Sequence, residues 1–394
     1  MNTFELPSYI SLVLRKLNEA GEEAYIVGGA VRDHLLGKQP HDFDVATSAL
    51  PQKTMEVFAG FHMYTNGMKH GTVGVIVDHQ AVEITTFRTD AEYLDNRHPD
   101  HVTFVRSLRE DIFRRDFTIN AMAYHPSKGI IDYVGGQEDL KHGIVRAIGE
   151  PKKRFEEDAL RILRALRFSA RLNFTIEEKT EAALFSEREL LQYIARERMS
   201  TEFTMLLKEK AGIAVVKKYA EILKYASDFP FENLSLSDDF FEREDSFAFR
   251  FAALLYDLKA ENVKEELKRM KLSKAEITHI LYLLEEIRAD LSNPLIQAEH
   301  LRKHGLEGAA ELVEFQKRFG YCKEAEEVLS KLKERFENGI YSLGQLAVSG
   351  ADLTEIPPAK RAGILENLLD RVILEELPNK REVLLEEIAK MKNA

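Results

Sequence analysis

The chain has 394 residues, and its composition excludes several classes of protein. Hydrophobic residues at 44% and charged residues at 31% describe a globular protein rather than a disordered one. The length exceeds that of one ordinary core, so we expect about two to four compact units. A formal net charge of −11 argues against a nonspecific polyanion binder, although nucleic-acid recognition depends on the local field.

Nothing in the sequence predicts secretion or membrane insertion. Residues 1–17 carry an acid early and only a short apolar run, unlike a signal peptide. No stretch approaches the roughly eighteen apolar residues of a membrane span. The only cysteine, Cys322, has no partner for a disulfide or a cysteine-based zinc site. We therefore expect a soluble, cytoplasmic protein without a membrane partner.

The first 145 residues or so mix strand and helix signals, which predicts an α+β or α/β unit. Short β-branched segments that predict strands lie at 24–27, 43–47, 72–77 and 81–87. Residues 71–90 predict a hairpin that turns at 78–80, with Val73, Val75 and Val77 on one side. The polar segment 90–107 has no periodicity and predicts a mobile loop.

From about residue 152, apolar residues recur three and four apart, which predicts helices to the end of the chain. Breaks subdivide this part at 227–239, 291–295 and 355–360, and we find no repeat of fixed period. The window 141–171 holds nine Lys or Arg against four acids, a local excess of five. It is the best candidate for a polyanion-binding surface.

Gly28 and Gly29 stand between the predicted strand at 24–27 and a predicted helix that carries Arg32. Two glycines allow the backbone to approach a ligand, and helix N-terminal amides with an arginine suit a triphosphate. The Walker pattern GxxxxGK[ST] is absent. Strand, glycines and helix also occur as plain turn geometry, so this pattern alone does not establish phosphate binding.

Asp42 and Asp44 are two residues apart, a spacing that in a strand points both carboxylates to the same face. Mg²⁺ takes such oxygen ligands beside substrate phosphates. Glu83, in the predicted hairpin, shares this face if the strands are neighbours. Three converging carboxylates would hold two metals for an in-line phosphoryl displacement, whereas an isolated Asp-x-Asp is more often two solvent-facing acids.

Residues 156–168 read EEDALRILRALRF and predict an amphipathic helix. Its polar half carries Asp158 and three arginines, Arg161, Arg164 and Arg167. A surface helix with ion pairs between residues three apart is the plain alternative.

Four motifs together resemble the class II tRNA nucleotidyltransferases, or CCA-adding enzymes, whose relatives include bacterial poly(A) polymerases. These motifs are GGAVRD (28–33), DFDVATS (42–48), RRDFTINAMAY (114–124) and RFEEDALRILRALRF (154–168). The resemblance covers roughly residues 22–205. It implies an α+β fold whose N-terminal nucleotidyltransferase head has a five-stranded mixed sheet, followed by an all-helical neck, body and tail. The implied boundaries are 1–145 for the catalytic head, 146–208 for the base-recognising neck, 209–330 for the body and 331–394 for the tRNA-binding tail.

The resemblance also implies a role for each motif residue. Asp42, Asp44 and Glu83 would be catalytic, and Asp42 and Asp44 would bind Mg²⁺. The residues implied to bind the nucleotide are Gly28, Gly29, Arg32, Arg115, Asp116, Asn120, Glu157, Asp158, Arg161, Arg164 and Arg167. The segment 89–106 matches the family's flexible loop, and RERMSTEF (196–203) matches a motif regarded as structural.

The chemistry of the bases agrees with the implied role of Asp158 and Arg161. Cytosine and adenine each present an exocyclic amine beside an unprotonated ring nitrogen, whereas uracil and guanine present a carbonyl beside an N–H. An aspartate that only accepts and an arginine that only donates therefore match C and A and mismatch U and G. Glu157 would orient the arginine, as the family implies.

The implied reaction is template-independent addition of CCA to the tRNA 3′ end from CTP and ATP, with Mg²⁺ as cofactor. The partners would be the tRNA acceptor arm and 3′ end, and a homodimer is left open. A-adding, CC-adding and poly(A)-polymerase specificities are the alternatives within the family. An antibiotic nucleotidyltransferase could share the glycines and Asp-x-Asp but would not need RRDFTINA, and intact carboxylates speak against a noncatalytic tRNA-binding relic. The tail segment PPAKRAG (357–363) lacks the family's glycine-rich form, so tail contacts stay open.

Overall fold

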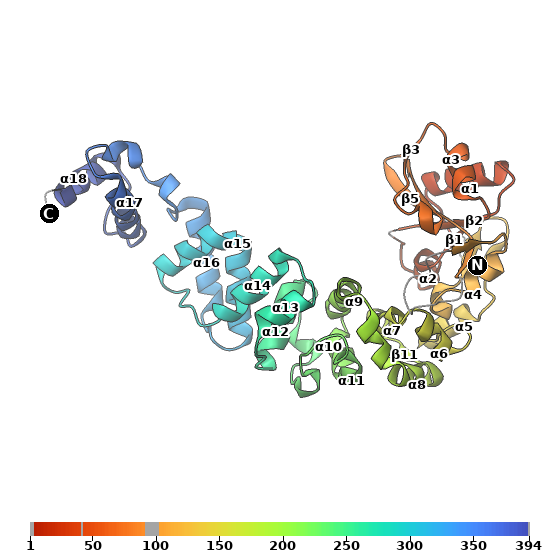
Figure 1. The fold of residues 1–394 in the computed structure, drawn as a ribbon. Helices are drawn as coiled ribbons and strands as arrows, with labels where there is room; N and C mark the ends of the chain where they lie inside the picture. Colours follow the sequence, from red (N-terminus) through yellow and green to blue (C-terminus); the bar gives the residue numbers. More distant parts are fainter. Residues whose placement is uncertain (1–3, 41, 91–101, 393–394) are drawn as a thin grey trace. The chain divides into compact units, whose positions relative to one another are not determined.

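A computed structural model describes residues 4–40, 42–90 and 102–392 of the chain (Figure 1). It divides into two compact units. The first comprises Met1–Arg243 with Ala260–Leu272, and the second Glu244–Lys259 with Ser273–Ala394. The fourfold division into head, neck, body and tail stays a prediction.

A seven-stranded mixed sheet forms the N-terminal part of the first unit, with the order β3-β4-β5-β2-β1-β8-β9. Its strands are β1 (Ala24–Val27), β2 (Asp44–Thr47), β3 (His62–Tyr64), β4 (Thr72–Val77), β5 (Gln80–Thr86), β8 (Ala123–His125) and β9 (Gly129–Ile131). β2 and β5 pair in parallel, and every other pair is antiparallel. The α+β class is confirmed, but the predicted number of five strands is wrong. The additional strands span only three residues each, too few for a periodic signal.

The predicted hairpin is confirmed as β4 and β5. Val73, Val75 and Val77 are buried, and the two-residue turn uses Asp78 and His79, both with positive φ as the tight hairpin turn requires. The helices of this part are α1 (Ser8–Glu19), α2 (Gly29–Leu35), α3 (Pro51–Val57), α4 (Leu108–Phe113) and α5 (Gly136–His142). α1 packs on β1, and α3 packs on β4 and β5 (Figure 1). α1 and α3 therefore cover part of the sheet.

The predicted mobile loop at 90–107 is only partly described. Its flanks form a second small sheet from β6 (Arg88–Asp90) and β7 (Val102–Phe104), which pair antiparallel. Residues 91–101 lie outside the described residues.

The rest of the first unit is mainly helical. Its helices are α6 (Pro151–Glu157), α7 (Leu160–Leu172), α8 (Glu178–Ser186), α9 (Arg196–Lys208), α10 (Gly212–Lys218), α11 (Ala220–Leu223) and α13 (Val263–Arg269). The prediction of an all-helical neck is wrong at one point, because β10 (Ile144–Val145) pairs in parallel with β11 (Thr175–Ile176). Asn173 ends α7 in the left-handed region, and the β-branched pair after it extends into this strand.

The second unit is helical, as predicted. It contains α12 (Phe247–Asp257), α14 (Lys274–Glu285), α15 (Pro294–Arg318), α16 (Ala325–Asn338), α17 (Pro358–Ile373) and α18 (Arg381–Lys392). Gly305, with φ of 69°, kinks α15. None of the helices in the described part of the chain is long and apolar enough to cross a membrane.

Candidate active site

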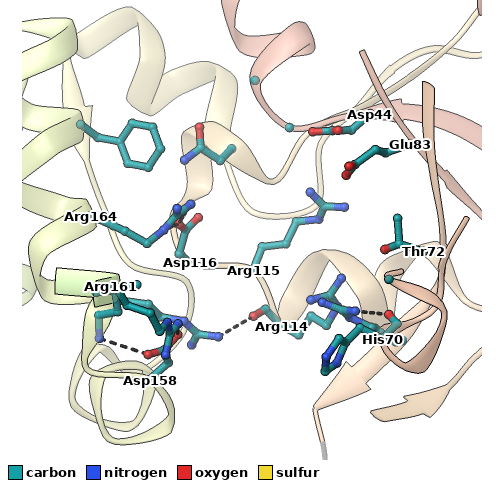
Figure 2. A pocket seen from close by; sticks show the side chains of 18 of the residues that line it. Asp44, His70, Thr72, Glu83, Arg114, Arg115, Asp116, Asp158, Arg161 and Arg164 are labelled. Carbon is teal, nitrogen blue, oxygen red and sulfur yellow. Dashed lines mark hydrogen bonds and ion pairs between the residues drawn. The ribbon is translucent and has the colours of Figure 1, made fainter. Parts of the chain in front are cut away.

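Two carboxylates lie side by side on the sheet. In the parallel pair of β2 and β5, Asp44 stands opposite Glu83, so both side chains point to the same face (Figure 2). The pKa of Asp44 is raised because the surrounding protein partly desolvates its carboxylate, which still opens into the cavity, and because Glu83 and Asp42 repel its charge. Arg115 opposes this rise. We call Asp44 and Glu83 the carboxylate face.

The double glycine sits beside these carboxylates. Gly28 has φ of 71°, a conformation that favours glycine, and a Cβ on it would lie 3.7 Å from Arg115 Nη1 and 4.0 Å from Asp44 Oδ2. The first turn of α2 then buries Arg32, which donates to Asp33 Oδ1 at 2.8 Å and to Asn120 Oδ1 at 2.7 Å. Burial lowers the pKa of Arg32, although Asp33 partly restores it. The glycine turn, Arg32 and the carboxylates therefore border the same space.

Asp111 holds two neighbouring arginines. Its buried carboxylate accepts from Arg114 Nε at 2.9 Å and from Arg115 Nη2 at 2.9 Å. Burial alone would raise the pKa of Asp111, but Arg115 and Arg114 hold it below its usual range. Arg115 is thereby fixed next to the carboxylate face.

The arginines of α7 are paired with acids from other elements. Arg164 Nε donates to Asp116 Oδ2 at 2.8 Å, and Glu202 Oε2 accepts from Arg167 Nε at 2.6 Å. Glu202 also lies 3.4 Å from Arg164 Nη1, so its buried carboxylate bridges the two arginines. Burial would raise the pKa of Asp116, but Arg164 lowers it. We call Arg161, Arg164 and Arg167 the arginine face.

Asp158 does not lie on a continuous helix with these arginines, contrary to the prediction. It has φ of −151° and ψ of 101° and separates α6 from α7. Its Oδ1 accepts the backbone N–H of Leu160 at 3.1 Å, the local bond that makes aspartate a helix-start residue. Its Oδ2 accepts from Arg198 Nη2 at 2.8 Å. Both carboxylate oxygens are thus fixed at the start of α7.

Arg161 is held by other groups than those that hold Asp158. Its Nη1 donates to Glu157 Oε2 at 2.7 Å, and its Nη2 donates to the carbonyl oxygen of Arg114 at 3.1 Å. Glu157 therefore contacts Arg161 as the resemblance implied. Figure 2 shows Asp158, Arg161 and Arg164 across the cavity from Asp44 and Glu83.

One cavity of about 1030 Å³ joins these groups. The predicted site residues that line it are Gly28, Gly29, Arg32, Asp44, Glu83, Arg115, Asp116, Asn120, Asp158, Arg161, Arg164 and Arg167. Asp42 and Glu157 are not among the lining residues. Asp42 is exposed just before β2, and Glu157 contacts the lining residue Arg161.

Several residues of the site were missed in the sequence, among them Arg198, Asp111 and Glu202. Arg198 lines the cavity and pairs with Asp158, although its motif RERMSTEF was interpreted as structural. Asp111 and Glu202 stand behind the arginines and are almost fully buried. The available signal was a cationic segment with too few acids of its own. Buried arginines need acidic partners, so such a segment indicates that acids from elsewhere in the chain pair with it.

The described residues contain no cluster of three or more histidine, cysteine or acidic side chains that could hold a metal. The expected convergence of three carboxylates is therefore not seen, because only Asp44 and Glu83 pair on the sheet. These two still fit a hard cation, since they are oxygen ligands whose mutual repulsion a cation would offset.

Comparison with protein families matches three parts of the chain. Residues 24–146 match the poly A polymerase head domain. Residues 173–222 match the probable RNA and SrmB-binding site of polymerase A, and residues 245–388 match a putative tRNA nucleotidyltransferase domain 2.

Comparison with whole proteins covers nearly the full length. The chain is 39% identical to a CCA-adding enzyme of Enterococcus faecalis over 95% of this chain and 93% of that one. It is 37% identical to a CCA-adding enzyme of Lactococcus lactis subsp. cremoris over 96% and 95% of the two chains. The crystal structure of the Bacillus stearothermophilus CCA-adding enzyme in complex with CTP matches with a TM-score of 0.78 at 32% identity, over 98% of both chains. The chain therefore belongs to the family of CCA-adding enzymes, which are tRNA nucleotidyltransferases.

Proposed function

We propose that this chain adds CCA to the 3′ end of tRNA from CTP and ATP, without a nucleic-acid template. The observation that carries the proposal is the single cavity that joins the carboxylate face to Asp158 and Arg161. A phosphoryl-transfer centre and a hydrogen-bonding pair suited to C and A then act on the same nucleotide. The single cysteine fits a cytoplasmic site of action.

The carboxylates supply the reaction centre of this proposal. Asp44 and Glu83, with Asp42 from just before β2, would supply the oxygen ligands for Mg²⁺, which when bound would activate the RNA 3′-hydroxyl and balance charge on the departing pyrophosphate. The raised pKa of Asp44 supports this, because a neighbouring cation stabilises the ionised form.

The glycine turn and Arg32 would receive the phosphates. The RNA 3′-hydroxyl attacks the α-phosphorus, the new ester bond forms, and the bond to pyrophosphate breaks. Gly28 allows close approach of the backbone, and Arg32 is held ready by Asp33 and Asn120. No covalent enzyme intermediate is needed.

Asn120 and Asp116 would position the ribose. The Nδ2 of Asn120 is buried without a hydrogen-bond partner among the described residues, while its Oδ1 is occupied by Arg32. A buried unpaired donor costs free energy, so a ligand oxygen there would be favoured. Asp116 would contribute by fixing Arg164 at the same wall.

Asp158 and Arg161 would select the base. Asp158 uses one bond on each oxygen, and an ionised carboxylate has about four acceptor sites, so capacity for an exocyclic amine remains. Arg161 would donate to the ring nitrogen while Glu157 keeps its orientation. The helical second unit would hold the acceptor arm through backbone and shape, as expected for duplex RNA.

One experiment tests the proposal and its rivals together. Transfer RNAs that lack one, two or all three nucleotides of the terminal CCA are incubated with CTP, ATP or both, and product lengths are read. The proposal expects every substrate to be completed and then extended no further. Completion only of the substrate lacking its last A, or only of the two cytidines, would establish A-adding or CC-adding specificity. Repeated A addition would establish a poly(A) polymerase.

A further inference from the structure

A row of facing residues crosses the sheet through the reaction centre. In successive strand pairs, Val27 faces Asp44, Asp44 faces Glu83, Glu83 faces Gly74, and Gly74 faces Tyr64. Facing residues in adjacent strands point to the same side of a sheet. The carboxylate face therefore lies between the glycine turn that follows β1 and the aromatic ring of Tyr64 on β3.

Tyr64 occupies space that Gly74 leaves open. A Cβ on Gly74 would lie 1.9 Å from Tyr64 Cζ and 2.1 Å and 2.3 Å from its two Cε atoms. The phenol end of the ring therefore lies over the backbone of β4 and next to Glu83. Burial and the Glu83 carboxylate raise the pKa of Tyr64, so its hydroxyl stays neutral. The half-buried ring also lines the cavity.

This end of the cavity differs from the arginine face in chemistry. Its lining residues are Tyr64, Asn66, Gly67, His70 and Thr72, from β3, the turn after it, the short helix η1 (Met68–His70) and β4. Arg88 donates to the carbonyl oxygen of His70 and so ties η1 in place. His70 and Thr72 lie on the Glu83 side, away from Arg161 and Arg164 (Figure 2). Such a wall suits a base and sugar better than a triphosphate.

The geometry of phosphoryl transfer determines which reacting group approaches from the Tyr64 end of the cavity. In an in-line displacement the attacking and leaving oxygens lie on opposite sides of the phosphorus. If pyrophosphate leaves toward the glycine turn and Arg32, the attacking hydroxyl approaches from the Tyr64 end of the row. The cavity of about 1030 Å³ is at the upper limit of the roughly 300–1,000 Å³ usual for one small ligand. It therefore has room for a second nucleotide.

We propose that Tyr64 is a positioning residue for the acceptor RNA, and that the 3′-terminal nucleotide of the RNA stacks on its ring beside Glu83. Aromatic side chains commonly hold single-stranded nucleotides this way, with little dependence on the base. That tolerance suits a primer end that changes from the discriminator nucleotide to C during successive additions. The inference rests on the proposed function, because it uses the direction of attack assigned there.

The test compares Tyr64→Leu with Tyr64→Phe in steady-state extension of tRNA. Loss of one stacked base is expected to raise the KM for tRNA about tenfold in Tyr64→Leu, while the KM values for CTP and ATP change less than about twofold. Tyr64→Phe keeps the ring and should stay near wild type. Gly74→Ala should resemble Tyr64→Leu, because its Cβ displaces the ring. Tyr133→Leu is the matched control, since Tyr133 is exposed in the same unit but does not line the cavity.

A binding experiment separates this inference from the proposed function. RNA ending in 5-iodocytidine is irradiated with the inactive Asp44→Asn variant, and the crosslinked residue is mapped. A crosslink at Tyr64 supports the inference whether or not the wild-type chain completes CCA. A crosslink on the α7 arginines, or a Tyr64→Leu variant that loses affinity for CTP instead of tRNA, overturns it. Failure of the wild type to extend any tRNA would instead reject the proposed function.

Discussion

The arginine face and the carboxylate face, on two walls of the cavity, differ in how their charges are balanced. On the arginine face, each guanidinium group has an acid from another element, with Asp116 and Glu202 bound to Arg164 and Arg167. On the carboxylate face, Asp44 stands next to Glu83, and its pKa is raised. The charges of the arginine face are therefore balanced within the protein. The carboxylate face keeps a repulsion between two acids that a bound cation or proton would relieve. Paired charge thus fixes shape, and unbalanced charge lies where the proposed reaction would use a cation.

The largest effect should follow from neutralising the carboxylate face. Asp44→Asn and Glu83→Gln should each lower kcat by about 10³-fold or more, because several kcal/mol of transition-state stabilisation by a metal would be lost. Binding of CTP measured by calorimetry in the absence of metal should be nearly unchanged. Substantial turnover by Asp44→Asn would mean that the difference in charge balance between the two faces does not contribute to catalysis.

Changes at Asp158 and Arg161, the proposed base-selecting residues, should alter specificity more than rate with the correct nucleotide. Asp158→Ala should reduce the preference for CTP over UTP by about 10²- to 10⁴-fold, because a buried hydrogen-bonding mismatch no longer excludes uracil. Competition between labelled CTP and UTP measures the ratio. Arg146→Ala is the control, since it breaks contacts with Asp139 and Glu177 outside the cavity. Equal loss of preference in both variants would point to general loosening of the fold.

Local sequence patterns predicted the carboxylate face in part, since Glu83 lies opposite Asp44 but Asp42 does not line the cavity. Alternation of Val73, Val75 and Val77 fixed the hairpin and hence the side on which Glu83 lies. The neighbouring strands then brought Glu83 opposite Asp44, as the two-residue period allows. Such predictions succeed because the period of a strand depends on adjacent residues only.

The arginine face was harder to predict, because its partners are distant in the chain. Arg198 contacts Asp158 from forty residues away, and Glu202 reaches Arg167 from thirty-five. The helix break at Asp158 was hidden by apolar periodicity on both sides, although aspartate is a preferred helix start. The structure of the arginine face depends on ion pairs between distant residues and on helix capping. Neither produces a periodic pattern in the sequence.

Removing a partner from the arginine face should cost stability. Glu202→Gln leaves two buried or half-buried arginines without their shared carboxylate, so we expect the free energy of unfolding to fall by about 3 kcal/mol. Urea denaturation followed by circular dichroism measures it. Glu197→Gln, on the exposed side of the same helix, should change stability by less than about 0.5 kcal/mol. If the two variants were equally stable, the paired charges would not hold this wall together.

The smallest effect concerns pH and should have opposite signs at Asp44 and at Asp111. Asp44 has a raised pKa, so the folded protein binds its proton more tightly than the unfolded chain, and stability falls as pH rises from the ordinary carboxyl range through that pKa. Asp44→Asn should therefore raise the melting temperature slightly at pH 7 and by less at pH 4, without metal.

Asp111 provides the opposite case, because Arg115 and Arg114 lower its pKa. Its ionised form stabilises the fold above the ordinary carboxyl range, and this stabilisation is lost as pH falls through the lowered value. Asp111→Asn should therefore lower the melting temperature, with a larger drop at pH 7 than at acid pH. Added Mg²⁺ should raise the melting temperature of the wild type but not that of Asp44→Asn, since only a chain that retains the repelling carboxylates gains from binding the ion. Shifts of the same sign in both aspartate variants would show that Asp44 and Asp111 do not differ in charge balance.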